Sequence, residues 1–133
     1  MDLSLSGRTA LITGASSGFG AHFARLFVRE GARVVIGARR VDRIAALAEE
    51  LGDAALAVAM DVTDEASLIA AYDAAEERFG TVDTVIANAG ISADGRSTEV
   101  SAADLAGLVA TNFNGVYLTA REGAKRMIAA GFK

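Results

Sequence analysis

The sequence predicts a doubly wound α/β fold, in which helices cover both faces of a parallel β-sheet. Four short apolar segments, rich in β-branched residues, alternate with amphipathic segments of helical periodicity. The apolar segments begin at residues 9, 33, 56 and 84, so successive starts lie 24, 23 and 28 residues apart. Each interval has room for one strand and one helix, which is typical of right-handed strand-helix-strand units.

The four apolar segments are predicted to be strands buried on both faces. None of them alternates polar and apolar residues, and each has about the length of a buried strand. The predicted strands are Thr9–Thr13, Arg33–Gly37, Leu56–Met60 and Thr84–Ala87.

The segments between these strands carry apolar residues at helical spacing. The three stripes are Phe23, Leu26 and Phe27; Ile44, Leu47, Ala48 and Leu51; and Leu68, Tyr72, Ala75 and Phe79. A glycine, which suits the left-handed position past a helix end, follows each of them. A fourth helix is predicted from Ser101 to about Ala130, with Ser101 and Asp104 placed to form a variant of the capping box.

Length and composition favour a single folded domain. The 133 residues are 52% hydrophobic and 23% charged, which provides enough apolar material for a core. A net charge of -4 without a basic cluster argues against nucleic-acid binding, and no apolar run is long enough to span a membrane. The absence of cysteine excludes cysteine-based sites, and no metal site is predicted. Because Met1–Arg8 lacks the features of a signal peptide, we expect a soluble cytoplasmic protein.

Polar and glycine residues follow each predicted strand. In an open parallel sheet, ligands bind outside the carboxyl ends of the strands, so these segments are expected to lie along one ligand-binding edge. The four segments are Thr13–Gly20, Ala38–Arg40, Asp61–Thr63 and Asn88–Gly90.

The first of these segments lies where a strand must turn into a helix. A pyrophosphate binds well at a helix N-terminus when glycines let it approach the backbone N–H groups. The segment contains the glycines Gly14, Gly18 and Gly20 and the hydroxyl donors Ser16 and Ser17. A glycine and serine loop without a ligand is the alternative, because the spacing differs from the general Gly-x-Gly-x-x-Gly fingerprint.

Taken together, these segments resemble the short-chain dehydrogenase/reductase family along the whole chain. The glycine motif of the family, Thr-Gly followed by three residues and Gly-x-Gly, is matched by Thr13–Gly20. Its adenine-contacting Asp is similar to Asp61, its Asn-Asn-Ala-Gly segment to residues 87–90, and its active-site Asn to Asn112. Two positions depart from the pattern: Phe19 stands where Ile or Leu is commoner, and alanine replaces the first Asn of the second motif.

The resemblance implies a Rossmann-type domain that binds NAD(P), with strand order 3-2-1-4 for the part present. Residues 1–133 would form the N-terminal, cofactor-binding half of a longer domain. The implied reaction is hydride transfer between NADP(H) and a small alcohol or ketone. The catalytic Ser, Tyr and Lys of the family would follow residue 133, and the fourth helix would pack against a second copy in a homodimer or homotetramer.

The expected cofactor-binding residues cover four parts of the dinucleotide. They are Gly14, Ser16, Ser17, Gly18, Phe19 and Gly20 at the pyrophosphate end, Arg39 at the 2′-phosphate, Asp61 and Val62 at the adenine, and Asn88, Ala89 and Gly90 at the ribose near the nicotinamide. Two ordinary alternatives are open: Asp61 or Thr63 could cap the third helix, and Asn88–Gly90 could form a plain turn.

The end of the second predicted strand favours NADP over NAD. An acidic residue there would bind the ribose hydroxyls and repel a 2′-phosphate, but the position is Ala38, followed by Arg39 and Arg40. A guanidinium can bind a phosphate through two charge-assisted hydrogen bonds. NAD is the alternative cofactor, because the arginines could solvate a loop or Arg39 could stack on the adenine.

Asn112 interrupts an apolar helix stripe, so its amide is expected to be buried and hydrogen-bonded. It either satisfies a backbone group or holds a water in a proton path, and the resemblance implies the second, catalytic role. His22 is expected to be an ordinary residue of the first helix.

The resemblance implies a catalytic Tyr with a Lys four residues later, but Tyr72 is followed by Glu76 at that spacing and Tyr117 by Arg121. Because Tyr117 also lies inside the fourth helix rather than after a fifth strand, neither tyrosine is expected to be catalytic.

A second class of function is a non-catalytic nucleotide-binding module, formed by a truncated half domain. Such a module would bind NADPH without turnover. A methyltransferase built on the same sheet is disfavoured, because Ala38 stands where those sites usually have an acidic residue.

Overall fold

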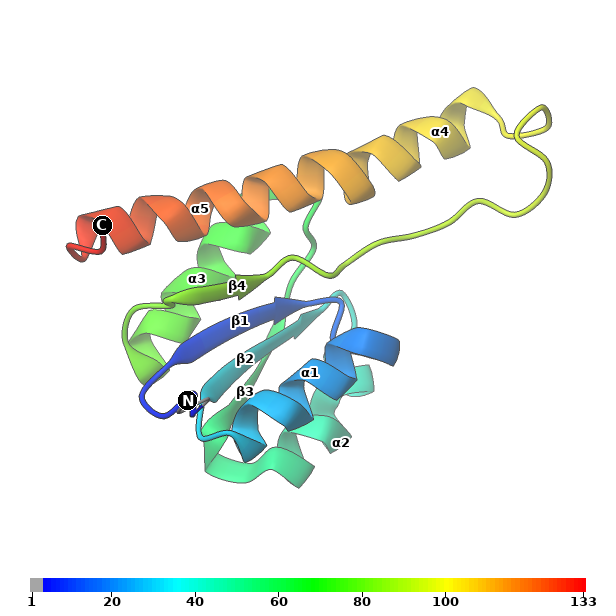
Figure 1. The fold of residues 1–133 in the computed structure, drawn as a ribbon. Coiled ribbons are helices and arrows are strands. Elements are labelled where there is room, and N and C mark those ends of the chain that lie inside the picture. The colour runs from blue at the N-terminus through cyan, green and yellow to red at the C-terminus, as the bar shows by residue number, and fades with distance from the viewer. Residues whose placement is uncertain (1–3) are drawn as a thin grey trace.

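The computed structural model describes residues 4–133; residues 1–3, the start of the segment that lacks signal-peptide features, lie outside the described residues. Its sheet has four parallel strands in the order β3-β2-β1-β4, which confirms the predicted order (Figure 1). The strands are β1 (Thr9–Thr13), β2 (Arg33–Ala38), β3 (Ala55–Ala59) and β4 (Thr84–Ile86). β3 begins and ends one residue earlier than predicted, and β4 ends before Ala87.

Helices cover both faces of the sheet, as expected for a doubly wound fold (Figure 1). They are α1 (Gly18–Arg29), α2 (Asp42–Leu51), α3 (Glu65–Phe79), α4 (Ala102–Val109) and α5 (Val116–Ala129). A short 3₁₀ turn, Gly52–Ala54, follows α2. α1 and α2 lie on one face, whereas α3 and α5 lie on the other. Within residues 4–133, no helix is both long and apolar enough to cross a membrane.

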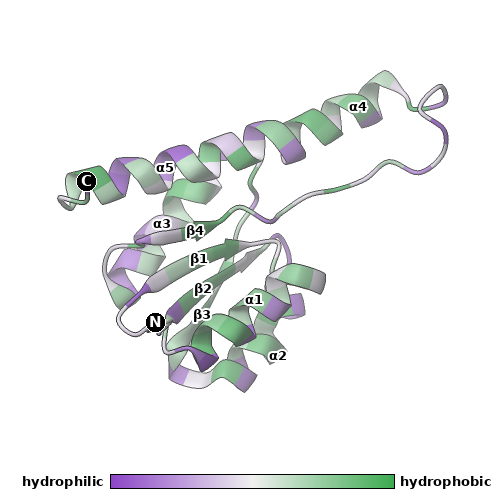
Figure 2. Cartoon of the chain, in the orientation of Figure 1, coloured by the Kyte–Doolittle hydropathy of each residue, from purple (hydrophilic) through white to green (hydrophobic). Residues whose placement is uncertain are grey.

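Alternate residues of β1 point to the two faces and enter two separate cores. Ala10 and Ile12 pack in the core under α1 and α2, whereas Leu11 packs with residues of α3. All three are fully buried. Figure 2 shows β1, β2 and β4 as mainly hydrophobic, while α5 mixes hydrophobic and hydrophilic residues along its length. A strand with two buried faces explains why no alternation is visible in the sequence.

The contact between α3 and α5 depends on a tyrosine and a glycine. Tyr72 is 0% exposed and its hydroxyl donates a 2.8 Å hydrogen bond to the carbonyl oxygen of Thr119. A Cβ at Gly123 would lie 2.8 Å from the Tyr72 hydroxyl and 2.8 Å from Cγ2 of Val85. The absence of a side chain at Gly123 therefore lets the two helices approach closely, and the prediction that Tyr72 belongs to the core is confirmed.

The predicted fourth helix is interrupted. Ser101 caps α4 as expected, accepting a 3.0 Å hydrogen bond from the backbone N–H of Asp104. However, Ala110–Gly115 forms a π-helical segment between α4 and α5. A Cβ at Gly115 would lie 2.6 Å from Cγ2 of Val62, so the π-helical segment passes very close to the segment that follows β3. Such π-segments frequently lie at functional sites.

Candidate functional site

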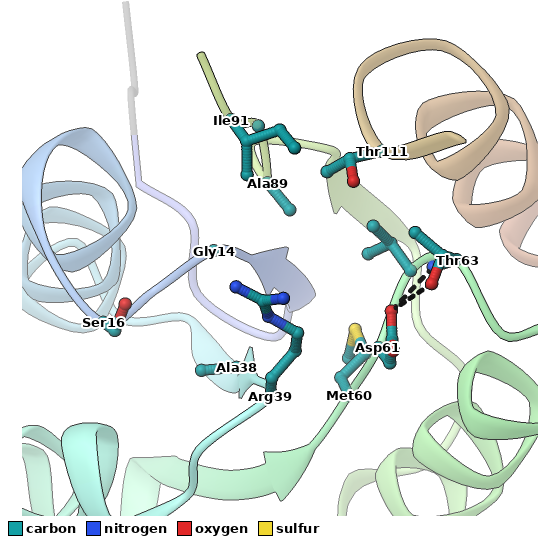
Figure 3. A pocket seen from close by; sticks show the side chains of 12 residues that line it. Gly14, Ser16, Ala38, Arg39, Met60, Asp61, Thr63, Ala89, Ile91 and Thr111 are labelled. Carbon is teal, nitrogen blue, oxygen red and sulfur yellow. Dashed lines mark hydrogen bonds between the residues drawn. The ribbon is translucent and has the colours of Figure 1, made fainter. Parts of the chain in front are cut away.

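A cleft of about 170 Å³ lies at the carboxyl ends of the strands, at the edge where the sequence predicts a ligand (Figure 3). Its walls come from the segments that follow all four strands and from the π-helical segment. The lining residues are Gly14, Ser16, Ala38, Arg39, Met60, Asp61, Val62, Thr63, Ala89, Gly90, Ile91 and Thr111. The four segments predicted to share one edge are therefore brought together.

Seven of the predicted site residues line the cleft and six do not. Those in the lining are Gly14, Ser16, Arg39, Asp61, Val62, Ala89 and Gly90. Those outside it are Ser17, Gly18, Phe19, Gly20, Asn88 and Asn112. Apart from Asn112, the residues outside the cleft are Ser17 at the N-cap of α1, three residues of the first turn of α1, and Asn88, which braces the turn before this helix. Their predicted contacts with a cofactor stay predictions.

The turn between β1 and α1 is narrow because two glycines face backbone atoms. A Cβ at Gly14 would lie 2.8 Å from Cα of Ala89, and Gly14 itself has a φ of 64°. A Cβ at Gly20 would overlap the carbonyl oxygen of Gly14. Ser17 is the N-cap of α1, but its side chain makes no capping hydrogen bond in the described chain. The first N–H groups of α1 thus lack a side-chain acceptor, as a pyrophosphate site requires.

The side chain of Asn88 braces this turn rather than lining the cleft. Its Nδ2 donates hydrogen bonds of 3.2 Å to the carbonyl oxygens of Thr13 and Gly14. In return, Oγ1 of Thr13 accepts 2.9 Å hydrogen bonds from the backbone N–H groups of Asn88 and Ala89. These four bonds tie the end of β4 to the end of β1, so the residues after both strands are held in register. Asn88 therefore has a structural role in this turn, and the predicted cofactor contacts of Asn88–Gly90 stay predictions.

Asp61 is held by Thr63 and does not cap α3. Its Oδ1 accepts hydrogen bonds from the backbone N–H of Thr63 at 2.9 Å and from the hydroxyl of Thr63 at 2.7 Å. These bonds, helped by the positive charge of Arg39, lower the pKa of Asp61 below its usual value. The N-cap of α3 is Asp64, which accepts a 3.0 Å hydrogen bond from the backbone N–H of Ala66. The alternative that Asp61 or Thr63 caps this helix is therefore wrong.

The two arginines after β2 have different surroundings. Figure 3 shows Arg39 reaching into the cleft, with Ser16 on one side and Asp61 on the other. Arg40 instead pairs with Asp42, with Nη2 of Arg40 lying 2.8 Å from Oδ2 of Asp42. Ala38 lines the cleft beside Arg39 and brings no carboxylate to it. Of these two residues, Arg39 is the one whose charge faces the cleft.

Asn112 is exposed, which corrects the expectation of a buried amide, and its side chain is hydrogen-bonded to the segment after β4. Its Oδ1 accepts a 2.8 Å hydrogen bond from the backbone N–H of Ile91, and its Nδ2 donates a 2.7 Å bond to the carbonyl oxygen of Ile91. Of the two roles considered for its side chain, the geometry shows the satisfaction of a backbone group. A catalytic role for Asn112 stays a prediction.

Replacing Asn112 with alanine is expected to lower the free energy of unfolding by about 1 to 2 kcal/mol, because two hydrogen bonds to Ile91 are lost. Because Ile91 and Gly90 line the cleft, ligand affinity should fall as well. Urea denaturation of the variant would measure the first effect. Asn114→Ala, an exposed neighbour in the same π-helical segment, is the control and should change stability little. An equal loss of unfolding free energy in both variants would contradict a stabilising role for the hydrogen bonds between Asn112 and Ile91.

Sequence reasoning missed several lining residues, among them Met60, Ile91 and Thr111. Thr111 comes from the π-helical segment, whose position has no signal in apolar periodicity. His22, which is expected to be an ordinary residue of the first helix, is exposed on α1, where its ring packs against that of Phe23.

A parallel 3-2-1-4 sheet with a glycine-lined turn after β1 defines a Rossmann-like α/β domain. Residues 8–132 match the model of the short chain dehydrogenase family, and the chain belongs to that family.

Three relatives illustrate the match. The chain is 39% identical over 127 residues to a sorbitol dehydrogenase of Cereibacter sphaeroides, covering 96% of this chain and 50% of that protein. It is 37% identical over 125 residues to an NADP-dependent (R)-specific alcohol dehydrogenase of Lentilactobacillus kefiri, covering 92% and 50%. The crystal structure of a 3-ketoacyl-(acyl-carrier-protein) reductase from Brucella melitensis complexed with NADH superposes with a TM-score of 0.92 at 43% identity, covering 96% and 53%. The chain thus spans about half the length of the relatives it matches.

Proposed function

We propose that this chain is the cofactor-binding half of an oxidoreductase that transfers a hydride between NADP(H) and an alcohol or ketone. The observation that carries the proposal is the cleft at the carboxyl edge of the sheet. It combines a glycine-lined turn, a cationic Arg39 and an anionic Asp61 in one hollow. A bound nicotinamide would supply the hydride chemistry, and the residues of this chain would bind and orient the dinucleotide.

The parts of the cleft and the adjoining start of α1 each suit one part of NADP(H). The N–H groups at the start of α1 suit the pyrophosphate, because Ser17 leaves them without a side-chain cap. The Oδ1 atom of Asp61 is engaged with Thr63, so Oδ2 is the oxygen suited to accept from the adenine amino group. The guanidinium of Arg39 suits a 2′-phosphate, and Ala38 brings no negative charge that would repel it.

Arg39→Ala is expected to weaken NADPH binding about tenfold while changing NADH binding less than about twofold, since only NADPH carries the 2′-phosphate. Fluorescence titration of the two reduced cofactors would measure both dissociation constants. Equal weakening of both cofactors would contradict the assignment and favour the alternative in which Arg39 stacks on the adenine. The comparison matters because one relative is named as NADP-dependent and another is described in complex with NADH.

A second candidate function is nucleotide binding without turnover by this chain alone. The observation that favours it is the position of the tyrosines, neither of which lines the cleft within the described residues. Tyr72 is fully buried, and burial raises its pKa above the usual value. Tyr117 is exposed on α5, with the guanidinium of Arg121 5.8 Å from its ring centroid. Oxidation of NADPH by the purified chain with a ketone would refute this candidate, whereas binding without turnover would support it.

A homodimer or homotetramer is the assembly we propose. Exposed apolar residues run along α4, the π-helical segment and α5, including Leu105, Phe113 (71% exposed) and Tyr117 (61% exposed). Exposed apolar rows of this kind commonly mark protein interfaces.

A further inference from the structure

A second hollow of about 450 Å³ adjoins the cleft on the side of α2. Its lining residues are Ser16, Ala38, Arg39, Arg40 and Arg43, and the first three also line the main cleft. Three guanidinium groups therefore border one hollow, and none of these five lining residues in the described chain is acidic. A hollow with this composition suits a multiply charged anion.

The three arginines are not equivalent. Arg40 is paired with Asp42, with Nη2 lying 2.8 Å from Oδ2 and Nε lying 3.3 Å from Oδ1. This forked contact uses the guanidinium face that would otherwise bind a phosphate and neutralises its charge. Arg39 and Arg43, by contrast, form no ion pair with any carboxylate of residues 4–133.

The backbone places Arg43 beside Arg40 at the start of α2. The N–H of Arg43 donates a 3.1 Å hydrogen bond to the carbonyl oxygen of Arg40, and α2 begins at Asp42. Arg43 is thus carried by the first turn of α2, whereas Arg39 directly follows β2. Two unpaired cations from different elements can bind a phosphate from two directions.

Building on the proposed function, we propose that Arg43 is the second cationic ligand of the adenosine 2′-phosphate, acting with Arg39. We further infer that Asp42 keeps Arg40 out of this site. A ribose 2′-phosphate presents three acceptor oxygens and up to two negative charges, so a single guanidinium leaves part of its hydrogen-bonding capacity unused. Arg43 supplies the remaining donors.

The test uses adenosine 2′,5′-bisphosphate as the probe and 5′-AMP, which lacks the 2′-phosphate, as the comparison. Isothermal titration calorimetry should show Arg43→Ala weakening the bisphosphate about tenfold and 5′-AMP less than about twofold. Arg40→Ala is the matched control, since it removes the same side chain from the same hollow, and should weaken the bisphosphate less than about twofold. Arg43→Lys should fall between wild type and Arg43→Ala, because lysine keeps the charge but not the fork.

The outcomes separate this inference from the proposed function. If the unsubstituted protein binds neither probe, the proposed function fails and this inference fails with it. If it binds both probes equally, the NADP assignment fails. If it prefers the bisphosphate and Arg39→Ala removes that preference while Arg43→Ala does not, the proposed function stands and only the role of Arg43 is refuted.

A second set of variants tests the role of Asp42. Asp42→Asn should release Arg40 and tighten bisphosphate binding about threefold, and the added Arg40→Ala substitution should remove that gain. If the gain persisted in the double variant, it would come from the general loss of negative charge and would overturn the role assigned to the pair. Thermal melts of all variants would verify that the exposed start of α2 stays folded.

Discussion

Replacing Gly20 with alanine is expected to lower the free energy of unfolding by about 3 kcal/mol and to abolish nucleotide binding. A Cβ at this position would overlap the carbonyl oxygen of Gly14 and lie 2.9 Å from Cα of Ala15 and 2.8 Å from Nδ2 of Asn88. Two of these neighbours are backbone atoms, so relief requires the turn before α1 to open. Opening the turn would displace the N–H groups that we assign to the pyrophosphate.

The control for the effect on stability is Gly18→Ala, which lies in the same first turn of α1. Gly18 has a φ of 55°, but apart from its chain neighbours and the backbone of its own helix, no heavy atom of the described residues lies within 4 Å of a Cβ built there. The substitution should therefore cost only the conformational strain, about 1 kcal/mol. Urea denaturation of both variants would measure the difference in stability, and NADPH titration of Gly20→Ala would measure the loss of binding. If Gly18→Ala lowered the free energy of unfolding as much as Gly20→Ala, steric overlap would not explain the destabilisation.

Arg126→Met is expected to lower the free energy of unfolding by about 3 kcal/mol at neutral pH, because it leaves a largely buried carboxylate without its main partner. Nε of Arg126 lies 2.8 Å from Oε1 of Glu122, which is 7% exposed, and its other nitrogens pair with Asp73 and Glu76 on α3. The guanidinium also lies 5.4 Å from the ring centroid of Tyr72. This arginine therefore connects α5 to α3 at the point where the two helices pack.

The destabilisation caused by Arg126→Met is expected to be larger at neutral pH than in acid. The hydrogen bond from Arg126, with a further one from Lys125, holds the pKa of Glu122 below its usual value. The stabilisation is therefore fully present at neutral pH, above the ordinary pKa of a glutamate, and is lost as pH falls through the lowered pKa of Glu122. In Arg126→Met the pKa of Glu122 should rise, so the stability difference between the two proteins should shrink in acid. Lys125→Met is the control: Lys125 is exposed and should contribute less than about 0.5 kcal/mol. A difference that stayed constant with pH would refute this account.

Local patterns in the sequence were sufficient to predict most of the fold. Apolar runs predicted all four strands to within one residue at each end, and helical stripes predicted α1, α2 and α3. The glycines around Thr13–Gly20 predicted the turn at the ligand-binding edge. These features are visible in sequence because they arise from neighbouring residues, through side-chain periodicity and backbone freedom.

Contacts between segments that are distant in the sequence determine the roles of Asn112 and Asn88, which local patterns could not predict. The side-chain amide of Asn112 is hydrogen-bonded to Ile91, 21 residues away in the sequence, and that of Asn88 is hydrogen-bonded to Thr13, 75 residues away. Periodicity could not reveal the π-helical segment, whose Gly115 packs against Val62 from a distant part of the chain.

The three arginines near α2 show the same division between sequence and tertiary structure. The sequence by itself determined that two arginines, and no acid, directly follow β2 at the ligand-binding edge. Only the tertiary structure distinguished Arg39, which reaches the cleft, from Arg40, which is neutralised by Asp42. It also brought Arg43 to the same hollow. The reason is physical: residue type sets which charges are present, but the folded backbone sets which of them meet and cancel and which face the ligand.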